Sequence, residues 1–230
     1  MREIVLDTET TGLKPAEGHR VVELGCVELL NRIPTGSTFH AYLNPDRDMP
    51  DAAFAVHGLS IDFLKDKPRF AEVADEFLAF VADAPIVAHN ASFDHGFLCH
   101  ELKLIARPQI PYDRVVDTLM LARRKHAAGP YSLDALCARY GIDNSRRTKH
   151  GALLDAEILA EVYLELIGGR QATLGLAADI ELPATSVDGA IILRTRPEPL
   201  KPRVSDAERE AHRAFVATLG ETAIWLGYRE

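Results

Sequence analysis

The sequence predicts an α/β fold: a mixed five-stranded sheet, built from an antiparallel meander and parallel strands, with helices on its faces. Two observations lead to this prediction. Three apolar segments near the N-terminus follow one another with short connections, which favours antiparallel pairing. After residue 70, segments with helical periodicity alternate with two short apolar segments, which favours parallel strands joined through helices.

Strands are predicted where runs rich in Val, Ile, Leu and aromatic residues end at Gly, Pro, Asn or Asp. These runs cover residues 4–9, 20–30, 37–43, 85–90 and 115–118. Helices are predicted where apolar residues recur every three or four positions, as Phe70, Val73 and Phe77 do. The predicted helices cover residues 70–81, 92–105, about 118–126, 132–140 and 152–167.

The chain changes character after the last of these helices. Prolines among charged residues predict a flexible linker, and the pattern Ser205-x-x-Glu208 predicts the capped start of another helix. We therefore expect a folded domain over 1–170, a short peptide over 171–176, a linker over 177–204 and a C-terminal segment over 205–230.

The composition is typical of a soluble globular protein, since 47% of the 230 residues are hydrophobic and 26% are charged. No apolar run approaches the ~20 residues that span a bilayer, and the N-terminus lacks the apolar region of a signal peptide. Cys26, Cys99 and Cys137 lack metal-type spacing, so we interpret them as reduced core residues. We expect a cytoplasmic protein with no membrane partner. The net charge of −8 argues against a protein that holds nucleic acid by bulk electrostatics.

The stretch IVLDTETTG ends a predicted buried strand with two acids, Asp7 and Glu9. Strand side chains alternate between faces, so these two carboxylates share a face and Thr8 points to the other. Two carboxylates held together repel each other and raise each other's pKa unless a cation lies between them. The sequence therefore needs a positive partner at this strand end, or further acids that complete a cation site.

Two further acids lie at comparable positions. Asp94 and Asp155 are each in the first turn of a predicted helix, and His150 lies in the loop before the second of these helices. Such segments converge at one edge of a sheet, and hard carboxylate oxygens suit Mg²⁺ or Mn²⁺. Four carboxylates around two such ions, ~3.5–4 Å apart, are a known solution for phosphodiester cleavage, and a nearby histidine can take the proton from the attacking water.

Some of these residues also have simpler structural interpretations. Asp94 and Asp155 could each be a first-turn acid that the helix dipole favours, and Asp117 fits that interpretation better than it fits the metal site. His89 and His95 flank the second motif and are interpreted as structural residues. A phosphatase of the D-x-D type is disfavoured because the second acid is a glutamate and the expected downstream lysine is missing.

Three motifs in order, DTETTG, HNASFD and HGALLDA, resemble the exonuclease motifs of the DEDDh 3′→5′ exonuclease superfamily, which has an RNase H-like fold. The block SLDALCARYGIDNSRRTKHGALLDAEILAEVYLELIGG is similar to the family of proofreading epsilon subunits of bacterial DNA polymerase III. The resemblance covers residues 1 to about 176 strongly and the tail loosely. It implies a metal-dependent 3′→5′ exodeoxyribonuclease that removes mispaired 3′ ends during DNA replication.

The resemblance also implies a role for each motif residue. Asp7 bridges two divalent ions, Mg²⁺ or Mn²⁺. Glu9 and Asp155 complete the first metal site, whereas Asp94 holds the second ion. His150 is the general base. The terminal nucleotide of the DNA 3′ end would lie in a pocket formed by Thr10, Leu13, His57, Asn90 and Phe93.

The tail indicates protein partners. Gln171, Leu174 and Leu176 in QATLGL resemble the short peptides that insert into the bacterial beta sliding clamp, although packing at a helix end would also explain such residues. The resemblance implies that the C-terminal segment binds the alpha subunit of polymerase III, and it leaves a small theta-like accessory subunit open. The alternatives are a stand-alone DEDDh exonuclease acting on RNA and a largely structural bridge between clamp and polymerase.

Overall fold

The computed structural model describes residues 1–147, 149–168 and 204–220 of the chain. Internal contacts divide the chain into two units, Met1–Thr173 and Leu174–Glu230, and each is described by itself. The predicted clamp peptide 171–176 and the predicted linker up to residue 203 lie outside the described residues, as do the last ten residues, 221–230.

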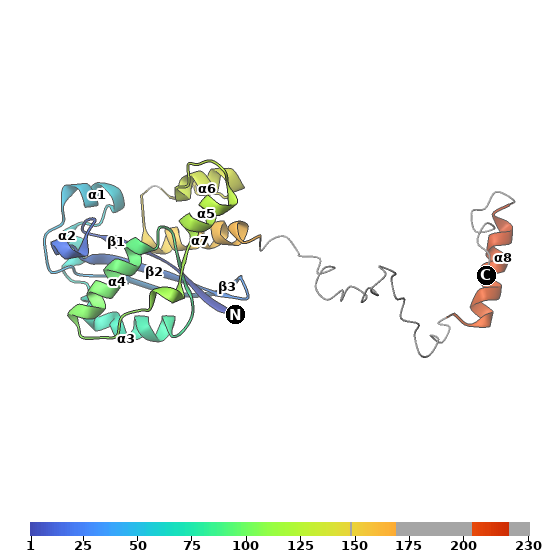
Figure 1. Cartoon of the computed structure of the whole chain (residues 1–230), viewed down its shortest axis with the longest axis horizontal. Helices are drawn as coiled ribbons and strands as arrows, with labels where there is room; N and C mark the ends of the chain where they lie inside the picture. Colours follow the sequence, from blue (N-terminus) through green and yellow to red (C-terminus); the bar gives the residue numbers. More distant parts are fainter. Residues whose placement is uncertain (148, 169–203, 221–230) are drawn as a thin grey trace, which may run out of the picture. The chain divides into compact units, whose positions relative to one another are not determined.

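The first unit is built on a mixed five-stranded sheet, as the sequence predicts (Figure 1). The first three strands form an antiparallel meander, and the fourth and fifth join it in parallel on the other side of the first. The spatial order is β3-β2-β1-β4-β5, and the strands are β1 (Arg2–Thr10), β2 (Val21–Leu30), β3 (Ile33–Tyr42), β4 (Ile86–Ala88) and β5 (Val115–Asp117).

Helices cover both faces of this sheet. Helices α3 and α4 contribute to one buried cluster, and helices α5, α6 and α7 contribute to the other. The helices and 3₁₀ turns of the first unit are η1 (Pro15–Glu17), α1 (Asp51–His57), α2 (Ile61–Leu64), α3 (Phe70–Val81), α4 (Ser92–Leu104), η2 (Tyr112–Arg114), α5 (Thr118–Lys125), α6 (Leu133–Tyr140) and α7 (Ala152–Leu166).

Strand β1 lies in the middle of the sheet and contributes to both clusters. Ile4 and Leu6 pack with α3 and α4, whereas Val5 packs with α7. The alternation continues along the strand, so Asp7 and Glu9 extend the face of α7 and Thr8 extends the face of α4. Both layers therefore meet at the C-terminal end of β1.

Two short helices, α1 and α2, lie in a region where the sequence patterns predict no element. Each helix has fewer than two full turns, so apolar residues cannot recur often enough in it to reveal a helical period. Local signals are present, because Gly58 ends α1 in the left-handed conformation and Ser60 caps α2. Strand β3 also begins earlier than predicted: Pro34 and Gly36 do not break it, since it is an edge strand.

In the second unit the structure describes α8 (Asp206–Thr218). The predicted capping box is confirmed: the Glu208 amide donates to Ser205 Oγ, and the Ser205 amide donates to the Glu208 carboxylate. Phe215 and Leu219 are exposed. Among the described residues of both units, no helix is long and apolar enough to cross a membrane. All three cysteines are free, and Cys99 is only half buried.

Candidate active site

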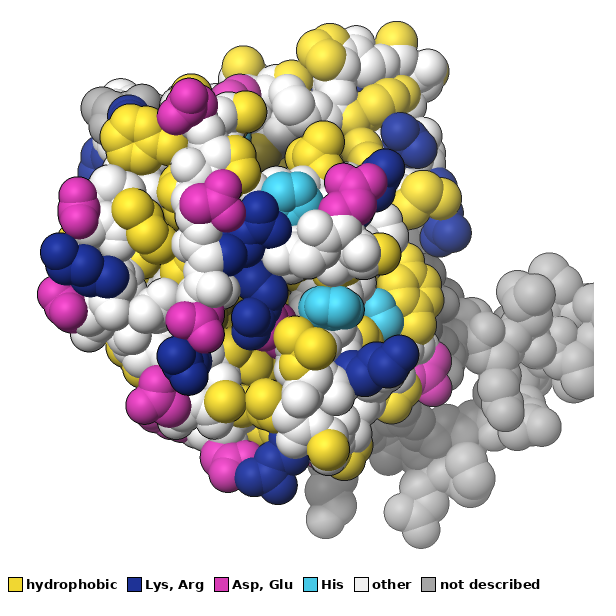
Figure 2. All heavy atoms as spheres, turned by 90° about the vertical axis from the view of Figure 1, so that its left-hand side faces the viewer, with side chains coloured by type: hydrophobic (Ala, Val, Ile, Leu, Met, Phe, Trp, Pro, Cys, Tyr) yellow, Lys and Arg dark blue, Asp and Glu magenta, His cyan; other side chains and the backbone are white. Residues whose placement is uncertain are grey.

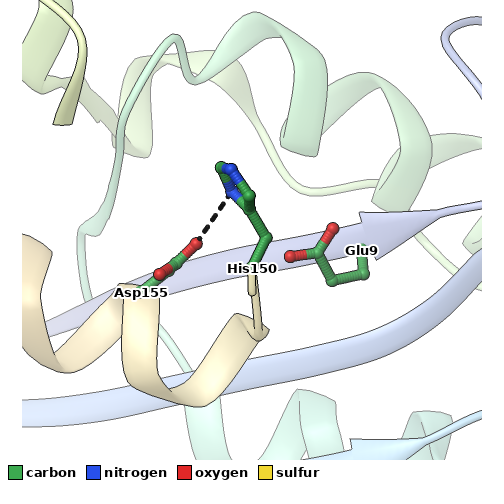
Figure 3. Close-up of side chains that lie close together, drawn as sticks. All are labelled: Glu9, His150 and Asp155. Atoms are coloured by element: carbon green, nitrogen blue, oxygen red, sulfur yellow. Dashed lines mark ion pairs between the residues drawn. The ribbon is translucent and has the colours of Figure 1, made fainter. Parts of the chain in front are cut away.

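Three of the predicted site residues point toward one another at the end of β1 (Figure 3). Glu9 comes from β1, Asp155 from the first turn of α7, and His150 from the loop before α7. One potential ligand atom from each residue lies within 4.8 Å of the others. Asp7 shares the face of Glu9 on the same strand, so the predicted first and third motifs meet here.

Gly25 explains how α7 comes so close to the sheet. It is paired with Asp7 in the β1–β2 ladder. A Cβ on Gly25 would lie 2.2 Å from the Leu153 amide nitrogen and 2.4 Å from the Ala152 carbonyl carbon. No residue with a side chain fits in that space, so the first turn of α7 packs directly on the backbone of β2 and carries Asp155 to the site.

Asp94 reaches the same place from the opposite face of the sheet. It lies in the first turn of α4 and is 3% exposed. The Thr8 hydroxyl donates a 2.7 Å hydrogen bond to Asp94 Oδ1. Strand alternation predicts correctly that Thr8 points away from Asp7, but that face is where Asp94 lies. Thr8 is thus a site residue that the sequence did not indicate.

Three of the site acids have pKa values above the ordinary values for carboxyl groups. Burial first, and then the repulsion of Asp155 and Glu23, raise the pKa of Glu9 from 4.5 to about 8. Burial raises the pKa of Asp94 from 3.8 to about 7, against the hydrogen bond from Thr8. Burial and the neighbouring carboxylates also raise the pKa of Asp7. Each shift therefore comes first from burial, which disfavours the charged form of a carboxyl group.

Arg147 is the second residue that the sequence did not indicate. Its guanidinium donates hydrogen bonds to both carboxylate oxygens of Asp155, at 2.5 and 2.8 Å. It also donates to Asp134 Oδ1 at 2.7 Å and to His150 Nδ1 at 2.6 Å. A guanidinium has no acceptor, so this Nδ1 carries no proton in the structure. The 3.3 Å contact from Nδ1 to Asp155 Oδ2, dashed in Figure 3, becomes an ion pair only when the ring is protonated.

Two adjoining cavities meet at these residues. The first, of about 680 Å³, is lined by Asp7, Glu9, Asp94, Asp155 and His150, together with Asn90, Arg123, Asp134 and Arg147. The second, of about 580 Å³, is mostly apolar and is lined by four of the predicted pocket residues, Thr10, Leu13, His57 and Phe93. Phe93 and Glu9 line both cavities, whereas the predicted pocket residue Asn90 lines only the first.

His57 has an unusual hydrogen-bonding state in the second cavity. The Leu59 amide donates to its Nδ1 at 3.0 Å, so Nε2 carries the proton. This buried Nε2 forms no hydrogen bond of regular geometry among the described residues, although the Thr10 backbone lies close enough to the ring to favour its protonated form. Burial lowers the pKa of His57, which keeps the ring neutral. A buried N–H donor without a partner is uncommon and indicates a place for a ligand acceptor.

The three residues with structural interpretations have structural partners. The Asp117 carboxylate caps α5 by accepting from the Leu119 amide at 2.9 Å, and it also accepts from the Asn90 amide. His89 Nδ1 lies 2.9 Å from the Thr118 hydroxyl, and His95 Nε2 lies 2.7 Å from the carbonyl oxygen of Ile110. His89 also lines the first cavity.

Comparison with known families fits this geometry. The exonuclease family RNase_T matches residues 4–163. The chain belongs to this exonuclease family. Among the family's members, the DNA polymerase III subunit epsilon of Rickettsia felis is 44% identical over 226 residues, which is 97% of this chain and 99% of that protein. The DNA polymerase III subunit epsilon of Escherichia coli is 48% identical, covering 97% of both chains.

Solved structures of exonucleases share the fold. Exonuclease X in complex with 5′ overhanging duplex DNA is 25% identical, with a TM-score of 0.57 over 72% of this chain and 91% of that one. The nuclease domain of 3′hExo, a DEDDh family member, is 16% identical, with a TM-score of 0.64 over 73% and 92%. The chain is thus a proofreading 3′→5′ exonuclease that depends on divalent metal ions.

Proposed function

We propose that this exonuclease removes mispaired 3′-terminal deoxynucleotides for a bacterial replicative polymerase, with two divalent ions, Mg²⁺ or Mn²⁺, bound by its four motif acids. One observation carries the proposal: the acids reach a single cavity from β1, α4 and α7, on both faces of the sheet. In this assignment Asp7 would contribute to both ion sites, Glu9 and Asp155 would complete one of them, and Asp94 would belong to the other.

The residues present fit such ions. All four side chains offer carboxylate oxygens, which are the donors that Mg²⁺ and Mn²⁺ prefer. Burial raises the pKa values of Glu9 and Asp94, so in the metal-free site these two acids retain protons that an incoming cation would displace. When bound, the ions supply positive charge that stabilises the attacking and leaving oxygens of an in-line displacement at phosphorus.

His150 is the proposed general base. Its imidazole is half exposed at the cavity that holds the acids, and its Nδ1 is unprotonated. Nδ1 can therefore take the proton of the attacking water once the Arg147 guanidinium leaves it. The imidazolium that forms would then face the Asp155 carboxylate, 3.3 Å away, which stabilises its charge.

The second cavity is the proposed site of the 3′-terminal nucleotide. Leu13 and Phe93 supply apolar surface against which a base can stack, and the unpartnered Nε2–H of His57 can donate to an oxygen of the nucleotide. Since the cavity adjoins the acids, an end seated here places its last phosphodiester beside them. A mispaired end separates from its template at lower cost than a paired one, and this difference supplies the preference.

The net charge of −8 fits a subunit that receives its DNA from a partner. Histidine, basic, acidic and apolar side chains lie close together on the face of the domain at this end of the sheet (Figure 2). Such a mixed surface suits local contact with one strand. We propose that the polymerase alpha subunit, bound to the C-terminal segment, presents the end to this face in the cytoplasm.

The same proposal extends to the remaining partners. Residues Gln171 to Leu176 would bind the beta sliding clamp, so that the chain links clamp and polymerase. A theta-like accessory subunit is compatible with this assembly. The exposed Phe215 of α8 and the exposed Leu219 that follows this helix support a docking role for the C-terminal segment, because apolar side chains at partner surfaces are commonly buried on binding.

An exonuclease assay on the purified full chain tests the proposal. The substrates are a DNA primer with a matched end, the same primer with a mismatched end, and an RNA strand. With Mg²⁺ we expect stepwise shortening from the 3′ end, faster for the mismatched primer and slowest for RNA, and no reaction in EDTA. Asp7→Ala protein, purified in parallel, controls for contaminating nucleases. Equal rates on RNA and DNA would favour a stand-alone ribonuclease instead.

A further inference from the structure

Arg147 is bound at the centre of the acidic site. Its side chain is 8% exposed, although it belongs to a loop. The Nε and Nη2 donors form a fork on the two oxygens of Asp155, Nη1 binds Asp134, and Nη2 also contacts His150 Nδ1. Fork contacts between guanidinium and carboxylate are among the strongest hydrogen-bonded ion pairs in proteins.

The neighbouring Arg146 shows that this placement is specific. Its side chain is 72% exposed, and its closest acidic partner among the described residues is Glu157, at 3.7 Å. Two adjacent arginines thus carry the same charge, but only Arg147 enters the site. The guanidinium of Arg147 also lowers the pKa values of Asp7 and Glu9, against the effect of burial.

A metal ion on Asp155 would meet this guanidinium. Both oxygens of Asp155 already accept charge-assisted hydrogen bonds, and a divalent cation beside a guanidinium is repelled by it. Asp134 offers the arginine another partner: it lines the same cavity, its side chain is 60% exposed, and it already accepts from Nη1. Arg147 can therefore leave Asp155 and remain bound at the rim.

We propose that Arg147 is the counter-ion of the metal-free site: it holds Asp155 and covers His150 Nδ1, and an incoming metal ion must displace it from Asp155. This inference rests on the proposed metal-ligand roles. Arg147 is thus a positioning residue that weakens metal binding and couples it to the base, because the same displacement exposes the Nδ1 lone pair. The site would keep its base covered until the metal is in place.

Calorimetric titration of Mn²⁺ into the full chain tests this inference. Arg147→Met should bind Mn²⁺ about tenfold more tightly than wild type or more, since a cation that competes for Asp155 is removed. Arg146→Met is the matched control, because it removes the same charge from the neighbouring position, and its affinity should stay close to wild type. Arg147→Lys keeps the charge without the fork, and it should give an intermediate affinity.

A second measurement follows His150 directly. The ¹⁵N shift of its Nδ1 should report an accepted hydrogen bond in the metal-free wild type, and this signature should be absent from metal-free Arg147→Met. If Arg147→Met does not fold, the Mn²⁺ affinity of Arg147→Lys decides the test, and it should exceed that of wild type. Unchanged or weaker Mn²⁺ binding in the Arg147 variants would overturn the inference alone. If the Asp7→Asn variant binds Mn²⁺ as tightly as wild type does, the metal assignment is overturned as well.

Discussion

Gly25 of β2 lies against Leu153 of α7 so closely that a Cβ on the glycine would be 2.2 Å from the Leu153 amide nitrogen. This contact sets the distance between the sheet and the helix that carries Asp155. Because backbone cannot yield as a flexible side chain can, the contact makes the geometry of the acids depend on the absence of one methyl group.

Gly25→Ala should therefore damage both stability and activity. We expect the free energy of unfolding to fall by ~1–3 kcal/mol, the usual effect of overpacking, and exonuclease activity to fall with it because Asp155 moves away from β1. Urea unfolding and a single-strand assay measure the two effects. Gly96→Ala is the control: its Cβ meets nothing within 4 Å in the interior of α4, so stability should rise slightly. Equal behaviour of the two variants would refute the packing argument.

Asp7→Ala and Asp155→Ala should both abolish nucleolysis but differ in stability without metal. Asp7→Ala removes a carboxylate whose neighbours repel it, so the metal-free melting temperature should equal or exceed that of wild type. Asp155→Ala leaves the fork donors of Arg147 without their acceptor, which should lower stability by roughly 1–3 kcal/mol. Melting temperatures measured by calorimetry in EDTA compare the stabilities of the two variants with that of wild type. Residual exonuclease activity in either purified variant would contradict the assigned roles.

Metal-free stability should decrease as the pH rises from about 4.5 to 8. The pKa of Glu9 is raised from 4.5 to about 8 on folding, so between these values the native state holds a proton that the unfolded chain has lost. Asp94, raised from 3.8 to about 7, acts in the same direction. The stabilisation is complete below the pKa values of the unfolded chain, 4.5 and 3.8, and it is lost as the pH rises through the native values of about 8 and about 7. Denaturant titrations in EDTA across this range measure the slope, and Glu9→Gln should flatten it. An unaltered slope in that variant would show that Glu9 is not the titrating group.

His150→Ala should lower the cleavage rate by a factor of ~10²–10⁴, the size of a typical general-base contribution. Mn²⁺ binding should persist, because the acids supply the proposed ligands. Rates under single-turnover conditions and calorimetric Mn²⁺ titration separate these two properties. His150 lies within ligand distance of Glu9 and Asp155, so loss of metal binding in the variant would make it a ligand and not the base.

The double variant Gln171→Ala, Leu174→Ala should retain full activity on free single strands and weaken the assembly with clamp and polymerase. A six-residue peptide buries little surface, so its own clamp affinity should be on the order of micromolar or weaker. Once the polymerase holds the other end of the chain, the effective concentration of the peptide at the clamp would rise and strengthen the contact. Gel filtration of the ternary assembly measures the difference. Clamp binding identical to wild type would mean that the sequence match arose by chance.

The mixed five-stranded sheet and the placement of the acids at strand ends and helix starts could be predicted because each follows from a local signal. Period-two alternation places Asp7 and Glu9 on one face, and the helix starts place Asp94 and Asp155 at sheet edges. The meeting of both faces at one strand end could not be predicted from alternation alone. It depends on α4 and α7 extending past the end of β1 from opposite sides, which is why Thr8 has a role there.

Arg147 could not be identified from its neighbours. In the run SRRTKH the two arginines are adjacent and carry the same charge, and their distances from the third motif differ by a single residue. Their exposures differ nine-fold, 72% against 8%, only because the folded loop turns one of them inward. Like-charge repulsion alone predicts that any acid removed from the site stabilises the metal-free protein. The ion pair with Arg147 reverses this expectation for Asp155.

Strand β3 is the long edge strand of the sheet, and its sequence is unfavourable for pairing with a further strand. Pro34 offers no amide hydrogen, and Gly36 has a φ of 83°, which turns the chain out of the regular pleat. The ladder to β2 also shifts register between Val27 and Leu29. A second copy adding a strand here would meet a broken row of donors, which disfavours edge-to-edge pairing.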